Sequence, residues 1–149
     1  MTRFAFRLDR ILGLRQALER ERAADLQVAL RREDAERESL ETLRRRYEEL
    51  QHETTRLAST QTVAGMIRNY GLVLDAALRS AKAQEEHVLE AERVRLEKQV
   101  SFDAARGDRR SLERLRDTAH GAWTVEDRRL EQRSLDEAAR HRPTGANLA

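Results

Sequence analysis

The sequence has no cysteine, one proline and few aromatic residues. Without cysteine, the chain can form neither a disulfide framework nor a thiolate site. The single proline is Pro143, so almost the whole chain lacks the residue that most strongly interrupts a helix. Three Phe, two Tyr and one Trp among 149 residues are too few for the filled interior of a compact domain of this length. These absences favour a rod over a globule.

Long apolar runs are also absent. No segment approaches the roughly 20 consecutive apolar residues that a membrane-spanning helix needs. Residues 1–7 (MTRFAFR) lack the apolar run of a secretory signal peptide. We therefore expect any contact with a membrane to be peripheral, and the absence of cysteine fits a reducing cytoplasm.

Neither sign of charge dominates the composition. Lys and Arg total 29 and Asp and Glu total 27, which gives a net charge of +2. Opposite charges alternate closely in residues 31–38 (RREDAERE), as expected for a solvated helix face with neighbouring ion pairs. Residues 44–46 form a basic cluster, but glutamates flank it, unlike the basic region of a DNA-binding zipper. Because interleaved charges produce no broad positive field, we expect no nucleic acid partner.

Apolar residues at helical spacing are abundant. Steps of three and four connect them in two stretches, one from Leu40 to Leu57 and one from Val63 to Ala91. Such steps place one narrow apolar stripe along each helix. Intrinsic disorder is the competing interpretation of a chain with 38% charged residues, but the periodic leucines argue against it. The sequence therefore predicts an all-α fold, a long antiparallel two-helix coiled coil (an α-hairpin).

The break between the two stripes predicts where the helices are connected. Residues 58–62 (ASTQT) are rich in side chains that hydrogen-bond to the local backbone and compete with helix formation. Gly65 and Gly71 lower the helix propensity of the next residues. We therefore expect the connection at about residues 58–71.

These features together predict a single coiled-coil hairpin over residues 1–142. Its first helix would cover about residues 4–57, and its second helix about residues 72–140. Pro143 and the glycine two positions later end the second helix, so we expect residues 143–149 to form a frayed tail.

Two places interrupt the apolar stripes. Between Arg31 and Ser39 only Ala35 is apolar, which predicts a loosely packed middle of the first helix with fast amide exchange. Near residues 102–112 the stripe of the second helix changes phase, which predicts a stutter in the supercoil.

Motifs for catalysis or metal binding are missing. The four histidines, at positions 52, 87, 120 and 141, show no metal-ligand spacing. One Glu-x-x-His sequence, Glu49 to His52, could supply half of a di-iron site in a helix bundle, but the chain has no second copy. Neither a Gly-x-Ser-x-Gly turn nor a glycine-rich phosphate loop is present. We therefore expect no enzyme activity, no cofactor and no metal.

Two apolar features have both a structural and a functional interpretation. Trp123 fits a narrow seam poorly and belongs to a residue type enriched at binding hot spots, so it is a candidate partner hot spot. In the structural interpretation it covers the small residues Ala119 and Ala122. The N-terminal patch that includes Phe4 and Phe6 is either ordinary packing of a helix end or a docking site.

The two ends of the chain carry a family resemblance. Residues 4–15 (FAFRLDRILGLR) look like the Phe-x-Phe-Arg-Leu opening and Leu-x-Leu-Arg continuation of the flagellar FliJ family. Residues 109–115 (RRSLERL) and 130–139 (LEQRSLDEAA) resemble the C-terminal part of the same family. The middle of the chain agrees in its spacing only. By these segments the sequence resembles the FliJ family of type III export proteins.

This resemblance implies a fold similar to the central stalk of rotary ATPases. It also implies a non-enzymatic role in the flagellar type III protein export apparatus. Proteins of this family stand in the pore of the hexameric flagellar export ATPase and promote the assembly and activity of its ring. They contact the membrane export gate protein, handle export chaperones, and stay in the cytoplasm, peripherally associated with the inner membrane at the flagellar base.

The resemblance also implies which residues contact each partner. The two chain ends would enter the ATPase ring, and the residues at that contact would be Phe4, Phe6, Leu8, Leu12, Leu135, Asp136 and Glu137. The opposite tip of the hairpin would contact the export gate through Val73, Leu74 and Ala77.

Two other functions compete with the export role. One is a generic coiled-coil scaffold that self-associates through its seams, which sedimentation would reveal as a stable dimer or larger species. The other is a basic helical nucleic-acid binder, whose affinity would fall steeply with salt.

Overall fold

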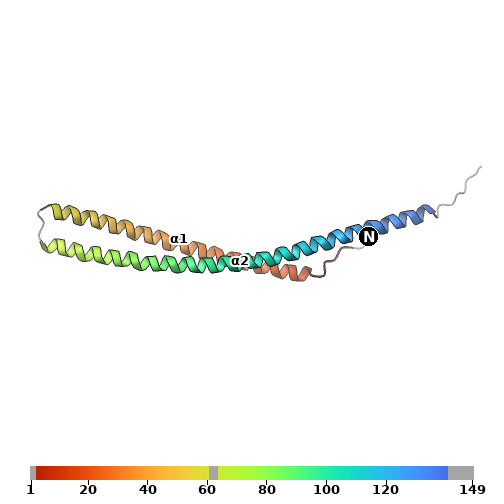
Figure 1. Cartoon of the computed structure of the whole chain (residues 1–149), viewed down its shortest axis with the longest axis horizontal. Coiled ribbons are helices and arrows are strands. Elements are labelled where there is room, and N and C mark those ends of the chain that lie inside the picture. Colours follow the sequence, from red (N-terminus) through yellow and green to blue (C-terminus); the bar gives the residue numbers. More distant parts are fainter. Residues whose placement is uncertain (1–2, 61–63, 141–149) are drawn as a thin grey trace, which may run out of the picture. The chain divides into compact units, whose positions relative to one another are not determined.

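The computed structural model describes residues 3–60 and 64–140. Over these residues it contains two α-helices of 51 and 77 residues, α1 (Asp9–Ser59) and α2 (Ala64–Arg140) (Figure 1). Neither described range contains a strand. The two helices pack against each other, which confirms the predicted all-α hairpin. Within the same ranges, no helical stretch is apolar over the length that crossing a membrane requires.

α1 begins at Asp9, later than the predicted start at residue 4. Residues 3–8 form a non-helical lead into the helix, which we call the N-terminal strap. A turn closes the strap, because the Asp9 N–H donates a hydrogen bond to the Phe6 carbonyl at 3.0 Å. The Asp9 carboxylate lies in the first helical turn, where a negative charge stabilises the helix dipole. Phe4 and Phe6 therefore precede the helix and do not belong to its apolar stripe.

The connection between the helices is shorter than the predicted range of residues 58–71. α1 continues to Ser59, and α2 already begins at Ala64 and not near residue 72. α2 ends at Arg140, and the predicted tail at residues 143–149 lies outside the described residues.

Packing explains why α2 starts early in spite of two glycines. Gly65 and Gly71 both lie inside α2, although glycine in a helix interior costs about 1 kcal/mol relative to Ala. Ile67 and Tyr70 lie between them and are half-buried, at a spacing of three that continues the seam. Burial of these two large side chains offsets the low propensity of the glycines.

Contacts between residues cluster in two units, each built from one segment of α1 and one of α2. Unit 1 consists of residues 1–19 and 105–149, and unit 2 consists of residues 20–104. The single domain over residues 1–142 stays a prediction.

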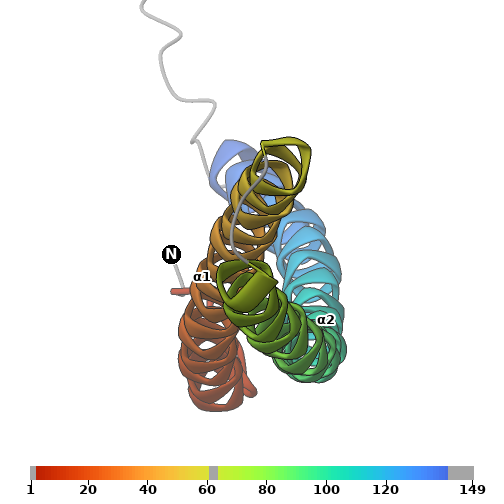
Figure 2. The same ribbon diagram turned by 90° about the vertical axis from the view of Figure 1, so that its left-hand side faces the viewer.

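The two helices run antiparallel inside unit 2. As residue numbers rise along α1, those of their partners fall along α2: Asp25 pairs with Lys98 at 3.2 Å, and Arg44 bonds to Glu85 at 2.8 Å. Figure 2 shows the two helices side by side at the end of unit 2 that carries the connection. This pairing is the antiparallel arrangement that the two apolar stripes predicted.

The buried seam of unit 2 is narrow and mostly aliphatic. α1 contributes leucines and one alanine, and α2 contributes alanines; the buried apolar residues are Leu26, Ala29, Leu40, Leu50, Ala81 and Ala91. Bulky side chains of one helix thus meet small side chains of the other. In the described ranges no large side chain is completely buried, which is typical of a pair of helices without further cover.

The middle of α1 is not loosely packed at its seam, contrary to the prediction. Glu33 is only 3% exposed, and it lies seven residues after Leu26 and seven before Leu40, at the same heptad position. Arg95 of α2 donates a hydrogen bond from Nε to Glu33 Oε2 at 2.8 Å. The apolar stripe disappears here because a paired carboxylate fills the seam position.

The predicted stutter in α2 is also absent. Phe102, Ala105, Arg109 and Leu112 are all buried or half-buried, and they follow one another in steps of three, four and three. The apolar pattern seemed to change phase because an arginine takes one of these seam positions.

Candidate partner-binding surfaces

An aromatic cluster lies in unit 1, where the N-terminal strap meets α2. The Phe4 ring contacts the His120 ring edge-on, with centroids 4.9 Å apart and planes at 90°. The Phe4 and Trp123 centroids are 5.8 Å apart, as are those of His120 and Trp123. Edge-on and tilted pairs at these distances are the favourable geometries for aromatic rings. We call Phe4, His120 and Trp123 the aromatic cluster.

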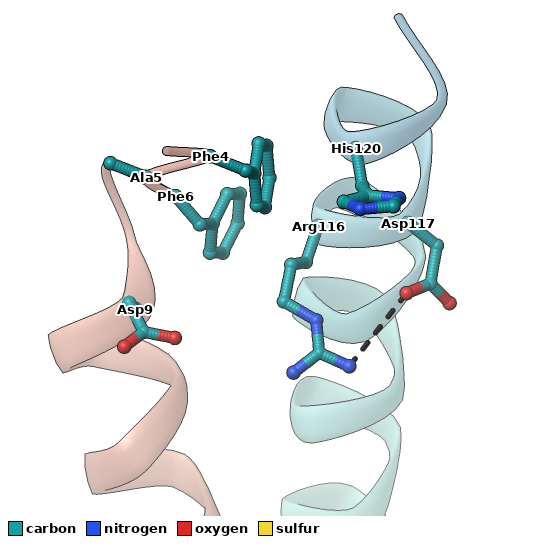
Figure 3. Close-up of a pocket in the computed structure, with 7 residues that line it drawn as sticks. All are labelled: Phe4, Ala5, Phe6, Asp9, Arg116, Asp117 and His120. Carbon is teal, nitrogen blue, oxygen red and sulfur yellow. Dashed lines mark ion pairs between the residues drawn. The ribbon is translucent and has the colours of Figure 1, made fainter. Parts of the chain in front are cut away.

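The sequence positions these rings by simple periodicities. His120 and Trp123 are three residues apart on α2, so their side chains share one helix face. Phe4 and Phe6 are two residues apart in the non-helical strap, where alternate side chains point the same way when the backbone is extended. Figure 3 shows both phenylalanine rings directed toward α2. The strap is therefore attached to α2 through its aromatic side chains.

A pocket of about 560 Å³ opens beside the aromatic cluster, between the strap and α2. Its walls are the residues drawn in Figure 3: Phe4, Ala5, Phe6, Asp9, Arg116, Asp117 and His120. The Arg116 guanidinium extends toward the strap and pairs with Asp117 at 3.7 Å. An aromatic wall beside charges of both signs suits contact with a protein side chain, and it contains no arrangement of nucleophile and base.

The predicted hot spot Trp123 is half-buried in this cluster. Its ring contacts Phe4 and His120, so the cover over Trp123 comes from the strap. Sequence reasoning had treated Trp123 and the Phe4/Phe6 patch as separate features, and it had missed His120. No local spacing signals this contact, because it joins residues more than a hundred positions apart.

Ion pairs between α1 and α2 also stabilise unit 1. Arg109 of α2 bonds to Glu19 of α1 and to Glu113 of its own helix. These two carboxylates, Glu19 first, raise the pKa of Arg109 above its usual value. Arg15 and Asp108 form a second link between the helices at 3.0 Å. These pairs fix the α1 segment of unit 1 on α2 at the base of the strap.

The residues expected to contact an ATPase ring lie in three environments of unit 1. Phe6 and Leu8 are half-buried in the strap, whereas Leu12 is 2% exposed and belongs to the packed seam. Leu135 is 70% exposed, and every residue from 128 to 140 is exposed. A partner can reach the strap and the last turns of α2 directly, but it can reach Leu12 only by opening the helix pair.

The exposed end of α2 begins with a cluster of arginines. Arg128, Arg129, Gln132 and Arg133 line a shallow pocket of about 400 Å³ on this stretch. Arg129 pairs with Glu126 at 2.8 Å, and both of these side chains remain well exposed. Apolar Leu135 thus follows a cluster of arginines on the same uncovered stretch of helix.

The residues expected to contact an export gate lie in unit 2 and differ in exposure. Val73 is 49% exposed, but Leu74 and Ala77 are half-buried at seam spacing. Leu72 is also exposed, although sequence reasoning did not single it out. The accessible apolar surface at this place is therefore formed by Leu72 and Val73.

The described residues contain no group of three or more acidic or histidine side chains that could hold a metal ion. Glu49 and His52, the one pair with di-iron spacing, are both exposed on α1. Their exposure agrees with a solvated helix face.

Comparison with known proteins assigns the chain to a family. A family model described as Flagellar FliJ protein matches residues 4–147, nearly the whole chain. No curated protein and no solved structure gives a significant match. The match includes both ends of the sequence, where the strap and the uncovered part of α2 lie. The chain therefore belongs to the FliJ family of flagellar proteins.

Proposed function

We propose that this protein is a non-enzymatic component of the flagellar type III export apparatus. In this proposal it stands in the pore of the hexameric export ATPase ring and promotes the assembly and activity of the ring. It also contacts the membrane export gate protein and handles export chaperones. It acts in the cytoplasm at the flagellar base and reaches the inner membrane only through these partners.

The observation that carries the proposal is the uncovered end of α2. All of residues 128–140 are exposed, and they include Leu130 and Leu135, two large apolar side chains. Nothing in the intramolecular packing of unit 1 requires these leucines. An exposed apolar side chain inside a family-matched segment supports a partner surface, for which the ATPase ring is the proposed occupant.

The arginines of the same stretch support a mobile contact with the ring. Arg128 and Arg133 precede Leu135 on the same exposed stretch of α2. Exposed ion pairs with carboxylates of a ring would contribute about 0–1 kcal/mol each. Several weak contacts of this size would hold the stalk in a pore without fixing one orientation.

The N-terminal strap supplies the second part of the proposed ring contact. Phe4, Phe6 and Leu8 are half-buried against unit 1, so part of each side chain is accessible to a partner. Asp136 and Glu137 are exposed next to Leu135 and complete this surface. Leu12 contributes from beneath, by packing the helix pair that supports the strap.

The proposed gate contact uses the beginning of α2. Val73 offers an exposed aliphatic side chain, and its neighbour Leu72 enlarges the same surface. Leu74 and Ala77 are half-buried, so they would contact the gate at their accessible edges only. Replacement of Val73 by Asp is expected to weaken gate binding, whereas Leu96→Asp, at a similar exposure elsewhere on α2, is expected to leave it unchanged.

Stimulation of the purified flagellar export ATPase tests the ring contact. Leu135→Ala removes an apolar side chain that is 70% exposed, and Leu89→Ala removes one that is 65% exposed elsewhere on α2. We expect Leu135→Ala to raise the concentration needed for half-maximal stimulation by about tenfold, because a central apolar contact is worth that much. Leu89→Ala should leave it unchanged. Equal behaviour of the two variants would contradict the proposed contact.

A self-associating scaffold is the second candidate, and one observation favours it. Leu89, Leu96 and Val100 are exposed on α2 in unit 2, at spacings of seven and four that place them along one helix face. Sedimentation of the isolated chain separates the candidates. The export proposal expects a monomer, whereas the scaffold requires a stable dimer that Leu96→Glu disrupts.

A further inference from the structure

A carboxylate lies in the seam of unit 2 and is as buried as the leucines around it. Glu33 is 3% exposed, compared with 8% for Leu26 and 8% for Leu40. Both of its oxygens have partners, since Arg95 of α2 donates to Oε2 at 2.8 Å and Arg37 lies 2.6 Å from Oε1. Arg95 is itself largely covered, with 23% of its side chain exposed. Glu33 and Arg95 therefore form a cross-helix ion pair inside the seam.

The apolar residues of the seam do not select one register of the two helices. On α1 the seam position of Glu33 recurs every seven residues, at Leu26, Leu40 and Tyr47. On α2 the position of Arg95 recurs in the same way, at Val88 and at Phe102. Because both patterns repeat every seven residues, a slide by one heptad brings seam positions opposite seam positions again.

The ion pair distinguishes the observed register from its neighbours. A slide by one heptad in either direction places Val88 or Phe102 opposite Glu33. The same slides place Leu26 or Leu40 opposite Arg95. Each slipped register would therefore separate the two charges and bury them against apolar side chains. This is unfavourable because each charge would keep only a more exposed partner on its own helix, Arg37 for Glu33 and Glu92 for Arg95.

We propose that the Glu33–Arg95 pair is a register lock, which excludes the one-heptad slips that the apolar seam of unit 2 would permit. Buried ion pairs add little net stability compared with apolar residues of similar volume, but they can specify register. Gln84 hydrogen-bonds to the Glu36 carboxylate at 2.6 Å and to its carbonyl at 3.1 Å, in the same register as the lock. That contact and the pair of Lys98 with Asp25 are more exposed, so they reinforce the lock without replacing it.

The sequence around the connection makes one slip direction easier. Because the hairpin is a single chain, a seven-residue slide shifts the connection by three to four residues along the sequence. Gly65 and Gly71 weaken the first two turns of α2, so that end of the helix unwinds most readily. Unwinding there moves the connection toward higher residue numbers and brings Phe102 opposite position 33. This is the slipped register that we expect when the lock is removed.

Cysteine crosslinking reads the register directly, since the chain has no native cysteine. The pair E36C/Q84C reports the observed register, because these side chains touch in it. The pair R44C/E92C reports the expected slip, because Glu92 lies one heptad after Glu85, the observed partner of Arg44. Each reporter pair is placed in the otherwise unchanged chain and in E33L/R95L, and disulfide formation is measured under mild oxidation.

With Glu33 and Arg95 unchanged, the first reporter pair should form its disulfide and the second pair should form little. In E33L/R95L the yield of the second reporter should rise by about tenfold or more, because the slip then no longer buries Glu33 and Arg95 away from each other. The charge-swapped variant E33R/R95E retains an ion pair, so it should give the first disulfide only.

Three results would overturn the register lock. One is the first disulfide alone in E33L/R95L, and another is the second disulfide in E33R/R95E. The third concerns E33Q/R95Q, which replaces the leucine variant if circular dichroism shows that E33L/R95L has lost helix. The first disulfide alone in E33Q/R95Q would also contradict the lock. None of these readouts involves an export partner, so they stand apart from the proposed function.

Discussion

The Phe4 ring contacts the His120 ring edge-on at 4.9 Å, and this contact attaches the N-terminal strap to α2. The strap is not helical, so its position depends on side-chain contacts more than on backbone hydrogen bonds. Trp123, the only tryptophan of the chain, lies within the same cluster. Its fluorescence therefore reports whether the strap is attached.

Phe4→Ala should detach the strap and expose Trp123 to water. The emission maximum of Trp123 should shift to longer wavelength, because the Phe4 ring that covers part of the indole is gone. The loss of stability should be about 1 kcal/mol or less beyond the burial of the ring, as for other aromatic pairs. Helix content should not change, since Phe4 precedes α1. Val28→Ala, an exposed position of unit 2, is the matched control and should leave the emission unchanged.

Glu33→Ala should destabilise the helix pair far more than the same change at an exposed glutamate. It leaves Arg95 largely covered without its main partner, a loss of about 3 kcal/mol. Glu90→Ala breaks an exposed, solvent-screened pair with Arg93 and should change the stability little. Both changes introduce alanine into a helix, so the difference in helix propensity cancels. Urea denaturation followed by circular dichroism measures the two losses, and equal midpoints would contradict the burial of Glu33.

The fold could be predicted from periodicity because the seam repeats every three and four residues over most of both helices. The prediction failed where charged residues fill seam positions. Glu33 looked like a gap in the stripe and Arg109 looked like a change of phase, since an apolar pattern alone cannot recognise a charge that is buried with its partner. These partners lie on the other helix, so no local window contains both.

The candidate surfaces could be predicted less well, for a similar reason. Phe4 and Trp123 were each singled out from the sequence, but their contact depends on how the strap folds back on α2. The predicted connection extended too far into α2 because Gly65 and Gly71 have low helix propensity. The burial of Ile67 and Tyr70, which outweighs that propensity, is a tertiary effect.

Amide exchange should follow burial along the helices. The amides of residues 31–39 should be as protected as those of residues 40–57, because Glu33 and its partner close the seam there. The amides of residues 128–140 should exchange much faster, since no segment within residues 3–60 or 64–127 covers that part of α2. Exchange at residues 31–39 that matches residues 128–140 would restore the loosely packed middle that the sequence predicted. Mass spectrometry of deuterated peptides resolves these three ranges.

Two exposed carboxylates, those of Glu53 and Glu90, should make the free energy of unfolding depend on pH in the acid range. Arg56 donates to Glu53 from Nε at 3.1 Å, and Arg93 donates to Glu90 from Nε at 2.9 Å. These hydrogen bonds lower the pKa of each carboxyl below its usual value of 4.5. The stability that the two pairs contribute is therefore fully present above pH 4.5 and is lost as the pH falls through the lowered folded-state pKa.

The carboxyl carbon signals of Glu53 and Glu90 report this effect in an NMR titration. In the unchanged protein both midpoints should lie below the usual glutamate value. Arg56→Gln should raise the midpoint of Glu53 toward that value and leave Glu90 unchanged, because the two pairs lie on different helices. A midpoint of Glu53 that does not respond to Arg56→Gln would assign the lowered pKa to another cause.

Gly71→Ala should stabilise the protein, because Gly71 lies inside α2 in an ordinary helical conformation. A Cβ added there meets no atom within 4 Å, so the methyl group fits without any rearrangement. Alanine restricts the unfolded chain and favours the helix, which should raise the free energy of unfolding by about 0.5–1 kcal/mol. Urea denaturation measures the gain, and Gly121→Ala, which is equally open and helical in unit 1, should give a similar one. A loss of stability at Gly71 alone would mean that α2 begins after this residue, near the start that the sequence predicted.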